Sequence, residues 1–473
     1  MKPSLLITFV ICIVALIYSY LASLPLIGDS ALYAQTIIEV ERTGKATYLG
    51  YKETWKSPIF FYIYAFFYRF FNFLSFNPSL MVSFPCVLFF LISVFFFYKI
   101  CRLFFDEKFS TIATLIFSIN PISAFIFSTP YIEAELMAFL LPSIYFYFLA
   151  LKKSYFLVPA GILFAISFGI KTYEAAIVPI LAIFYFLEQK ASKQKIFLLF
   201  CSFSFVIVPI ILNFSFFGTG EMFSYDIRRF FINPQNLIIF YYYFILLLFP
   251  YSIFSLFEFL KEKSTRIFDL WFSFIFLISI SANVYLWYYS PILPAIAVLA
   301  TKFIRKGSKL DYLLVSFLLV YSLFVSFYVV KGIKTTNINP TSHYGGEEEV
   351  KAAETLANKS NVLLLYYSPT FVYYYSFYSK YPLSVYWNGR ACWYERAYSH
   401  EQLEDAFSFK GEDITSGNKM WFNEIESIYA NPIQNISFVV VRDIDYMNNS
   451  KFFSSRGYYP YIIFSKILIL KKY

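Results

Sequence analysis

The chain has 473 residues, of which 59% are hydrophobic and 15% charged, and its mean hydropathy is +0.59. These values exclude an ordinary soluble globular protein and are typical of a membrane protein. The net charge of +9 does not indicate nucleic-acid binding, because the basic residues fall in short clusters between apolar runs, as in the loops of membrane proteins.

Apolar runs long enough to cross about 30 Å of hydrocarbon follow one another through the first 331 residues. We predict a multi-pass α-helical membrane protein of the cell membrane with about eleven transmembrane helices in residues 1–331. The first run is longer than the apolar part of a signal peptide and many runs follow it, so it is predicted to be a helix of this domain. The runs are residues 4–26, 79–104, 109–128, 134–151, 154–170, 172–188, 196–214, 235–258, 267–284, 286–304 and 311–331.

The lysines and arginines indicate how these helices are oriented. With the N-terminus in the cytoplasm every inner loop is basic, whereas most of the short outer loops carry few basic residues. This alternation requires that the run 58–74, which contains Arg69, lies at the membrane interface instead of crossing the bilayer. The first outer loop then covers about residues 27–78 and contains interfacial helices.

Residues 332–473 lack long apolar runs and are predicted to form an extracytoplasmic α/β domain. Within it we expect a helix over 347–358 and strands over 361–366, 436–441 and 461–470.

Asp29 is the strongest candidate for a catalytic residue, because it lies in the first charged segment after the first apolar run. A carboxylate near the bilayer boundary is costly to desolvate, and it can act as a general base toward an acceptor hydroxyl. The alternatives are an ordinary solvated residue or a cap for the helix that begins near Ala31.

Four basic residues are candidates to bind a phosphate. Lys56 stands beside Ser57-Pro58 at the start of the interfacial run, and Lys171 lies at the outer end of a span. A lysine supplies a compact charge for phosphate, but headgroup contact or interfacial anchoring would use the same positions. The pair Arg228 and Arg229 is a weaker candidate to contact an anionic lipid head.

Glu133 and Glu135 lie in the short second outer loop, at the opening of a helix and on the same predicted side as Asp29. Their oxygens suit a divalent cation or could orient a sugar, and the alternative is a pair of charges that favour the helix dipole. No glycine-rich phosphate loop, metalloprotease motif or nucleophile elbow is present, so this cation is the only cofactor that the sequence suggests.

Several short motifs in the first 330 residues resemble, in order, those of the GT-C membrane glycosyltransferases of the protein O-mannosyltransferase and lipid A aminoarabinose transferase type. The motifs are Asp29-Ser30-Ala31-Leu32-Tyr33-Ala34, Lys56-Ser57-Pro58, the acids Glu133 and Glu135, Gly169-Ile170-Lys171-Thr172-Tyr173, and Tyr289-Ser290-Pro291-Ile292-Leu293-Pro294. The resemblance implies a GT-C-like fold and the transfer of a sugar, with inversion, from a polyprenyl-phosphate donor to an acceptor hydroxyl on the extracytoplasmic face. The acceptor would be a protein, a lipid or a polysaccharide.

The resemblance also implies roles for single residues. Asp29 would take the proton of the acceptor, and Lys56 and Lys171 would hold the lipid phosphate. Either Glu133 or Glu135 would be the second acid of the site. Tyr33, in the first motif, is a further candidate to orient the acceptor or the sugar.

Two positions depart from the motifs of these families. Ser30 stands where a glutamate is common, and Ser57 separates Lys56 from Pro58.

Two other functions are compatible with the sequence. A transporter or flippase for a lipid-linked glycan would also need charged groups near a cavity, but the chain has no convincing internal repeat. A non-catalytic glycan-binding membrane subunit would tolerate substitution of Asp29 and Lys56.

Overall fold

The computed structural model divides the chain into two compact units. The first comprises Met1–Ser23 and Thr54–Lys331, and the second comprises Leu24–Glu53 and Gly332–Tyr473. Most of the first loop after helix α1 therefore groups with the C-terminal residues and not with the membrane helices. The residues described are 3–48, 51–52, 58–71, 77–212, 248–260, 266–282, 286–305, 309–336, 346–364, 368–379, 381, 383–387, 390–394, 437–455, 457–464 and 467–473.

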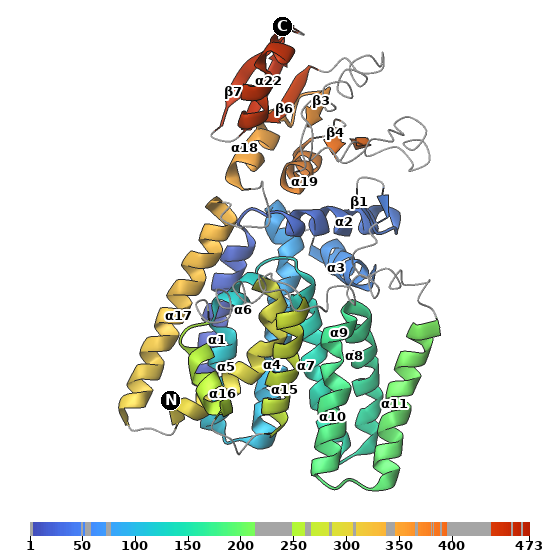
Figure 1. The fold of residues 1–473 in the computed structure, drawn as a ribbon, viewed down its shortest axis with the longest axis vertical. Coiled ribbons are helices and arrows are strands. Elements are labelled where there is room, and N and C mark those ends of the chain that lie inside the picture. The colour runs from blue at the N-terminus through green and yellow to red at the C-terminus, as the bar shows by residue number, and fades with distance from the viewer. Residues whose placement is uncertain are drawn as a thin grey trace. The chain divides into compact units, whose positions relative to one another are not determined.

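The described part of the first unit consists of helices and the segments that connect them (Figure 1). Within a bilayer each segment has to satisfy its own backbone hydrogen bonds, and a helix does so. The last helix, α17, continues into the second unit. The described helices are α1 (Pro3–Ala22), α3 (Pro58–Phe71), α4 (Pro78–Phe104), α5 (Glu107–Ser118), α6 (Pro121–Ile126), α7 (Ile132–Ala150), η2 (Ser154–Phe156), α8 (Leu157–Ile170), α9 (Thr172–Ala175), α10 (Ile177–Glu188), α11 (Lys193–Leu212), α14 (Tyr251–Leu260), α15 (Arg266–Ala282), η4 (Leu286–Ile292), α16 (Leu293–Arg305) and α17 (Lys309–Thr336).

Three helical stretches among the described residues are long and apolar enough to cross a membrane by themselves, namely Pro78–Phe104, Ile132–Ala150 and Ser316–Thr335. Other apolar helices are shorter, and the predicted number of eleven spans stays a prediction. Helix α3 has 14 residues, a length of about 21 Å, so it is too short to cross about 30 Å of hydrocarbon.

One predicted span is broken by a local signal. The run 109–128 forms α5 and then α6, because the side chain of Asn120 accepts a hydrogen bond from the Ser123 N–H and Pro121 occupies the first helical position. An asparagine cap followed by proline starts a new helix, so this run contains two helices instead of one.

Helix α7 lies in the core of the first unit, where it packs against α4 and α8 (Figure 1). Its first turn is buried, including both Glu133 and Glu135. Helix α3 approaches α8 closely at Gly169, where an added Cβ would lie 2.5 Å from Ile59 Cδ1. The glycine of the Gly169–Tyr173 motif thus makes room for α3 beside α8.

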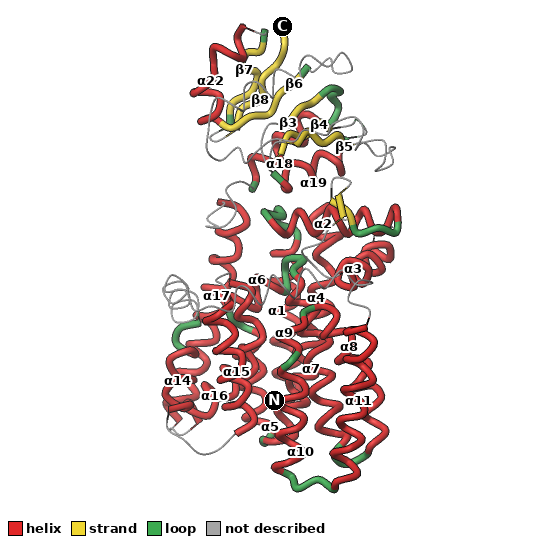
Figure 2. The backbone as a smooth tube through the Cα atoms, turned by 45° about the vertical axis from the view of Figure 1, so that its right-hand side comes forward, coloured by secondary structure: helices red, strands yellow, loops and turns green. Residues whose placement is uncertain are grey.

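The second unit contains a six-stranded sheet, drawn in yellow in Figure 2, in the order β5-β4-β3-β6-β8-β7. Strand β3 pairs in parallel with β4 and β6, and the other pairs are antiparallel. Strands β3, β6 and β8 are mostly buried and form the core of the sheet. The elements of the unit are α2 (Asp29–Thr43), β1 (Thr47–Tyr48), β2 (Tyr51–Lys52), α18 (Glu347–Leu356), β3 (Val362–Leu364), α19 (Pro369–Tyr378), β4 (Leu383–Trp387), β5 (Arg390–Tyr394), β6 (Phe438–Arg442), α22 (Asp443–Ser455), β7 (Tyr458–Ile463) and β8 (Ile467–Lys472).

The single strand expected over 461–470 is instead two strands, β7 and β8, which pair with each other. The Phe464 N–H donates a hydrogen bond to the Ile467 carbonyl oxygen at 2.8 Å and closes the turn between them. The run 461–470 contains neither glycine nor proline, so the sequence gives no strong turn signal within it.

Candidate functional site

Asp29 is the first residue of α2, and it is exposed. The residue before it, Gly28, has φ 52° and ψ −127°. L side chains rarely adopt this conformation, so glycine is needed here to turn the chain from the preceding extended segment into the helix.

The turn that leads to Asp29 is closed by Ser30. Its hydroxyl accepts a hydrogen bond from the Ile27 N–H at 3.0 Å and donates one to the Ile27 carbonyl oxygen at 2.8 Å. Ile27 and Ser30 are fully buried, and a buried backbone group needs such a partner. The serine that departs from the related motifs therefore has a definite role in this fold, since it holds the backbone beside the candidate catalytic acid.

The segment before α2 and the helix itself are both bonded to α19 of the same unit. The Leu26 N–H donates to Tyr374 Oη at 3.0 Å, and Thr370 Oγ1 donates to the Leu26 carbonyl oxygen at 3.1 Å. Further along α2, the Ser376 hydroxyl donates to Gln35 Oε1 at 2.9 Å.

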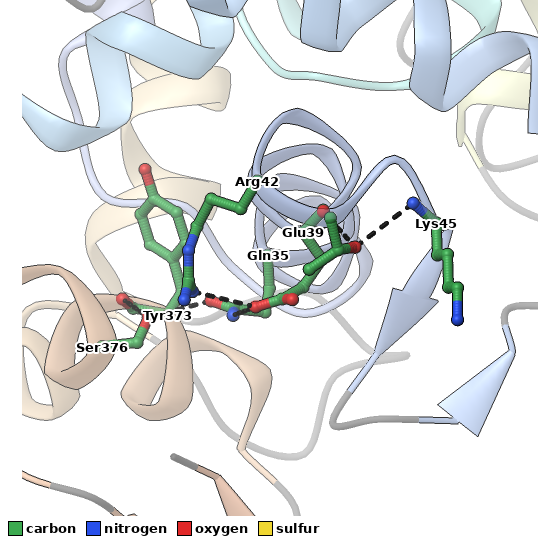
Figure 3. A network of polar contacts seen from close by, with 7 residues as sticks. Gln35, Glu39, Arg42, Lys45, Tyr373 and Ser376 are labelled. Atoms are coloured by element: carbon green, nitrogen blue, oxygen red, sulfur yellow. Dashed lines mark hydrogen bonds and ion pairs between the residues drawn. The ribbon is translucent and has the colours of Figure 1, made fainter. Parts of the chain in front are cut away.

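The contacts around Gln35 continue into a polar network, which Figure 3 shows from close by. Gln35 Nε2 lies 3.5 Å from Glu39 Oε1, and that oxygen also accepts from Arg42 Nη1 at 3.3 Å. The network joins α2 to α19 through neutral groups at its centre and an ion pair at its half-exposed end.

Tyr33 follows Asp29 by one helical turn and is buried. Positions four residues apart share a face of a helix, so the two side chains start from the same side of α2. The role of Tyr33 in orienting an acceptor or a sugar stays a prediction.

A second group of charged residues lies in the first unit. Lys171 Nζ is 2.8 Å from Glu133 Oε1 and 2.6 Å from Glu174 Oε1, and all three side chains are at most 5% exposed. Glu133 comes from the first turn of α7, Lys171 ends α8, and Glu174 lies on α9. The structure thus brings together two residues that the sequence singled out, and it adds Glu174.

Glu174 was not predicted as a site residue, although its spacing from Lys171 is a usable signal. Residues three apart are neighbours on a helix surface, and an acid and a base at that spacing commonly pair. Lys171 lies in the Gly169–Tyr173 motif, and Glu174 directly follows the motif.

Glu133 and Glu135 do not face each other, because residues two apart point to different sides of a helix. Glu133 contacts Lys171, whereas both carboxylate oxygens of Glu135 are buried and have no hydrogen-bond partner among the described residues. The Tyr64 hydroxyl, which comes from α3, donates to the carbonyl oxygen of Tyr131, the residue that precedes α7, at 3.3 Å.

Because Glu133 and Glu135 point in different directions, they are poorly arranged to bind one divalent cation together. Within the part of the chain that the structure describes, no group of three or more His, Cys, Asp or Glu side chains could hold a metal ion. Glu133 and Glu135 supply suitable oxygens, but the described residues do not gather them around one point.

The aromatic motif Tyr289–Pro294 forms η4 and the start of α16. Helix η4 packs against α6 and α7, and Trp271 Nε1 donates to the Pro291 carbonyl oxygen at 2.9 Å. The side chains of Tyr289 and Ser290 are fully buried beside these helices. Lys56, Arg228 and Arg229 lie outside the described residues.

Comparison with known proteins gives a family match over part of the chain and a fold for the whole of it. Residues 55–212 match the family of dolichyl-phosphate-mannose-protein mannosyltransferases. The crystal structure of ArnT from Cupriavidus metallidurans bound to undecaprenyl phosphate superposes with a TM-score of 0.69 at 14% identity, covering 99% of this chain and 97% of that one. The chain has the GT-C fold.

A second solved structure has the same fold. The oligosaccharyltransferase AglB from Archaeoglobus fulgidus, in complex with an inhibitory peptide and a dolichol-phosphate, gives a TM-score of 0.54 at 11% identity and covers 95% of this chain and 70% of that one. A search of curated protein sequences finds no match.

The family match and the GT-C fold confirm the resemblance and indicate a membrane glycosyltransferase. They favour an enzyme over a transporter or a binding subunit. The family match contains Glu133, Glu135 and Lys171, and Asp29 precedes it.

Proposed function

We propose that the protein transfers a sugar from a polyprenyl-phosphate donor to an acceptor hydroxyl on the extracytoplasmic face of the membrane, with inversion at the anomeric carbon. The exposed Asp29, at the end of a turn whose neighbouring backbone groups are paired, carries this proposal. The GT-C fold supports it, since the similar ArnT and AglB structures hold undecaprenyl phosphate and dolichol-phosphate. The acceptor would be a protein, a lipid or a polysaccharide.

In the proposed reaction Asp29 acts as the general base. Its carboxylate takes the proton of the acceptor hydroxyl while the oxygen of that hydroxyl bonds to the anomeric carbon. The bond between this carbon and the phosphate oxygen breaks, and the lipid phosphate leaves with the electron pair. A base held in place lowers the entropy cost of this step, and the bonded turn before Asp29 supplies such a placement.

The departing phosphate requires positive charge, since its negative charge grows in the transition state. We assign this role to Lys56, with Arg228 and Arg229 as further candidates. Lys171 already contacts two carboxylates, and a phosphate beside it would meet the negative charge of both. We therefore propose that Lys171 holds Glu133 and Glu174 in place rather than binding the phosphate itself.

The test is transfer of a labelled sugar from a polyprenyl-phosphate donor by the purified protein. Asp29→Asn should lower turnover by about 10²–10⁴-fold, the usual contribution of a general base. Its thermal stability should stay close to that of the wild type, because Asp29 is exposed.

Glu347→Gln is a matched control. Glu347 is also an exposed acid that begins a helix directly after a glycine, and it belongs to the same unit. This variant should keep full activity, and full activity of Asp29→Asn as well would rule out Asp29 as the base.

A further inference from the structure

The backbone that leads into Asp29 is held from outside its own helix by α19. Leu26 lies three residues before Asp29, and both of its backbone polar groups are bonded to side chains of α19. Leu26, Thr370 and Tyr374 are at most 2% exposed, so water does not compete for these two bonds.

Further hydrogen bonds follow between Leu26 and Asp29. After Leu26, both polar groups of Ile27 are bonded to Ser30, and the Gly28 carbonyl oxygen accepts from the N–H groups of Ala31 and Leu32. These bonds hold the backbone between Leu26 and Asp29. At its start, the segment is held by the hydroxyls of Thr370 and Tyr374.

Helix α19 is itself firmly placed in the second unit. The Ser368 hydroxyl accepts from the Phe371 N–H at 3.0 Å at its start, residues 369–376 are buried, and the helix packs against α18 and β4. A shift of α2 relative to α19 would break several buried hydrogen bonds at once, and each such group left unpaired is costly.

We propose that Thr370 and Tyr374 are positioning residues that set the place of the Asp29 carboxylate through Leu26. The proposal rests on the proposed function, in which Asp29 takes the acceptor proton. It assigns to the C-terminal part of the chain a role in the chemical step in addition to any contact with an acceptor.

The neighbouring tyrosine offers a matched comparison. Tyr374 and Tyr375 follow each other on α19, both are buried, and each hydroxyl bonds one backbone group at 3.0 Å. Tyr374 bonds the Leu26 N–H, whereas Tyr375 bonds the Lys359 carbonyl oxygen within the C-terminal segment. Phenylalanine at either position removes the hydroxyl oxygen and its hydrogen bond to the backbone.

The experiment measures transfer kinetics of the full-length protein with a labelled polyprenyl-phosphate sugar. Tyr374→Phe should lower kcat about tenfold with an unchanged KM for the donor, because a misplaced group affects the reaction more than binding. Tyr375→Phe should keep the wild-type kcat. Thr370→Val should act like Tyr374→Phe, and Thr370→Ser, which retains the hydroxyl, should restore the rate.

Hydrogen exchange supplies a readout that does not depend on activity. Amide exchange in residues 24–32 should be faster in Tyr374→Phe and Thr370→Val than in Tyr375→Phe or the wild type. This difference separates a local release of the turn from a general loss of stability, which would affect both tyrosine variants.

Two results would overturn the inference, and they are distinguishable. If Asp29→Asn is inactive but Tyr374→Phe and Tyr375→Phe have equal kcat, the positioning role is wrong and the proposed function stands. If Asp29→Asn is fully active, Asp29 is not the base, and the proposed mechanism falls together with the positioning role.

Discussion

The turn before Asp29 and the buried group around Lys171 hold acidic residues by opposite means. In the turn, neutral hydroxyls bond the backbone of Leu26 and Ile27, and the Asp29 carboxylate stays exposed to water. In the buried group, the charges of Glu133 and Glu174 are removed from water and depend on the ammonium of Lys171. Substitution of the exposed Asp29 should mainly affect chemistry, and substitution of the buried Lys171 should mainly affect folding.

The largest effect on stability should come from Lys171→Met. The change leaves two buried carboxylates without their cation, and breaking a buried ion pair in this way typically destabilises a protein by about 3–5 kcal/mol. Unfolding of the detergent-solubilised protein, followed by heat or denaturant, measures the loss.

Lys152→Met is the control, because Lys152 is exposed and a surface substitution usually changes stability by less than about 0.5 kcal/mol. A triple variant with Lys171→Met, Glu133→Gln and Glu174→Gln should recover part of the loss, since no buried charge of this group is then left uncompensated. Equal stability of Lys171→Met and the wild type would contradict the assignment of these contacts to the fold.

A smaller loss is expected for Ser30→Ala. The Ile27 N–H loses the Ser30 hydroxyl as its partner, whereas the Ile27 carbonyl oxygen keeps the backbone N–H of Ser30 at 3.1 Å. One buried donor without a partner costs about 1–3 kcal/mol. Turnover should fall as well, because the same turn carries Asp29.

Ser454→Ala is the matched control for this prediction. The Ser454 hydroxyl is exposed and bonds only the Lys451 carbonyl oxygen of its own helix, α22, so its loss should leave both unfolding and turnover nearly unchanged. A Ser30→Ala protein with wild-type turnover and stability would mean that the turn does not need its hydroxyl.

The two regions also differ in how far the sequence predicts them. Basic inner loops and short motifs placed Glu133 and Lys171 on one side of the membrane, and their contact is consistent with that placement. The pairing of Glu174 with Lys171 can be predicted from their i, i+3 spacing, which is a local pattern. The bonds from α19 to Leu26 cannot be predicted in this way, because they join residues 344 and 348 positions apart. Periodicity and capping patterns concern only residues that are close in sequence.

Ser30 and the C-terminal strands show the same limit at shorter range. A comparison of motifs shows only that Ser30 differs from the common glutamate. It does not show that the Ser30 hydroxyl bonds the backbone of Ile27. Strands β7 and β8 were expected as a single strand, because two polar residues in the apolar run of the sequence, Ser465 and Lys466, are a weaker turn signal than glycine or proline. The resemblance to the GT-C glycosyltransferases was easier to detect, since it depends on the order of several motifs.

The smallest effect should come from Arg42→Ala, at the far end of the same helix that begins with Asp29. Arg42 Nη1 lies 3.3 Å from Glu39 Oε1, and the two side chains are 30% and 12% exposed. A pair this accessible to water contributes about 0.2–1 kcal/mol, and about 1 M salt, with a Debye length of roughly 3 Å, should remove most of it. Unfolding measured at low and high salt therefore sharpens the comparison with Lys171. If Arg42→Ala destabilised the protein as strongly as Lys171→Met, burial would not explain the difference between the two groups of ion pairs. The polar network of α2 would then contribute to stability as much as the buried group around Lys171.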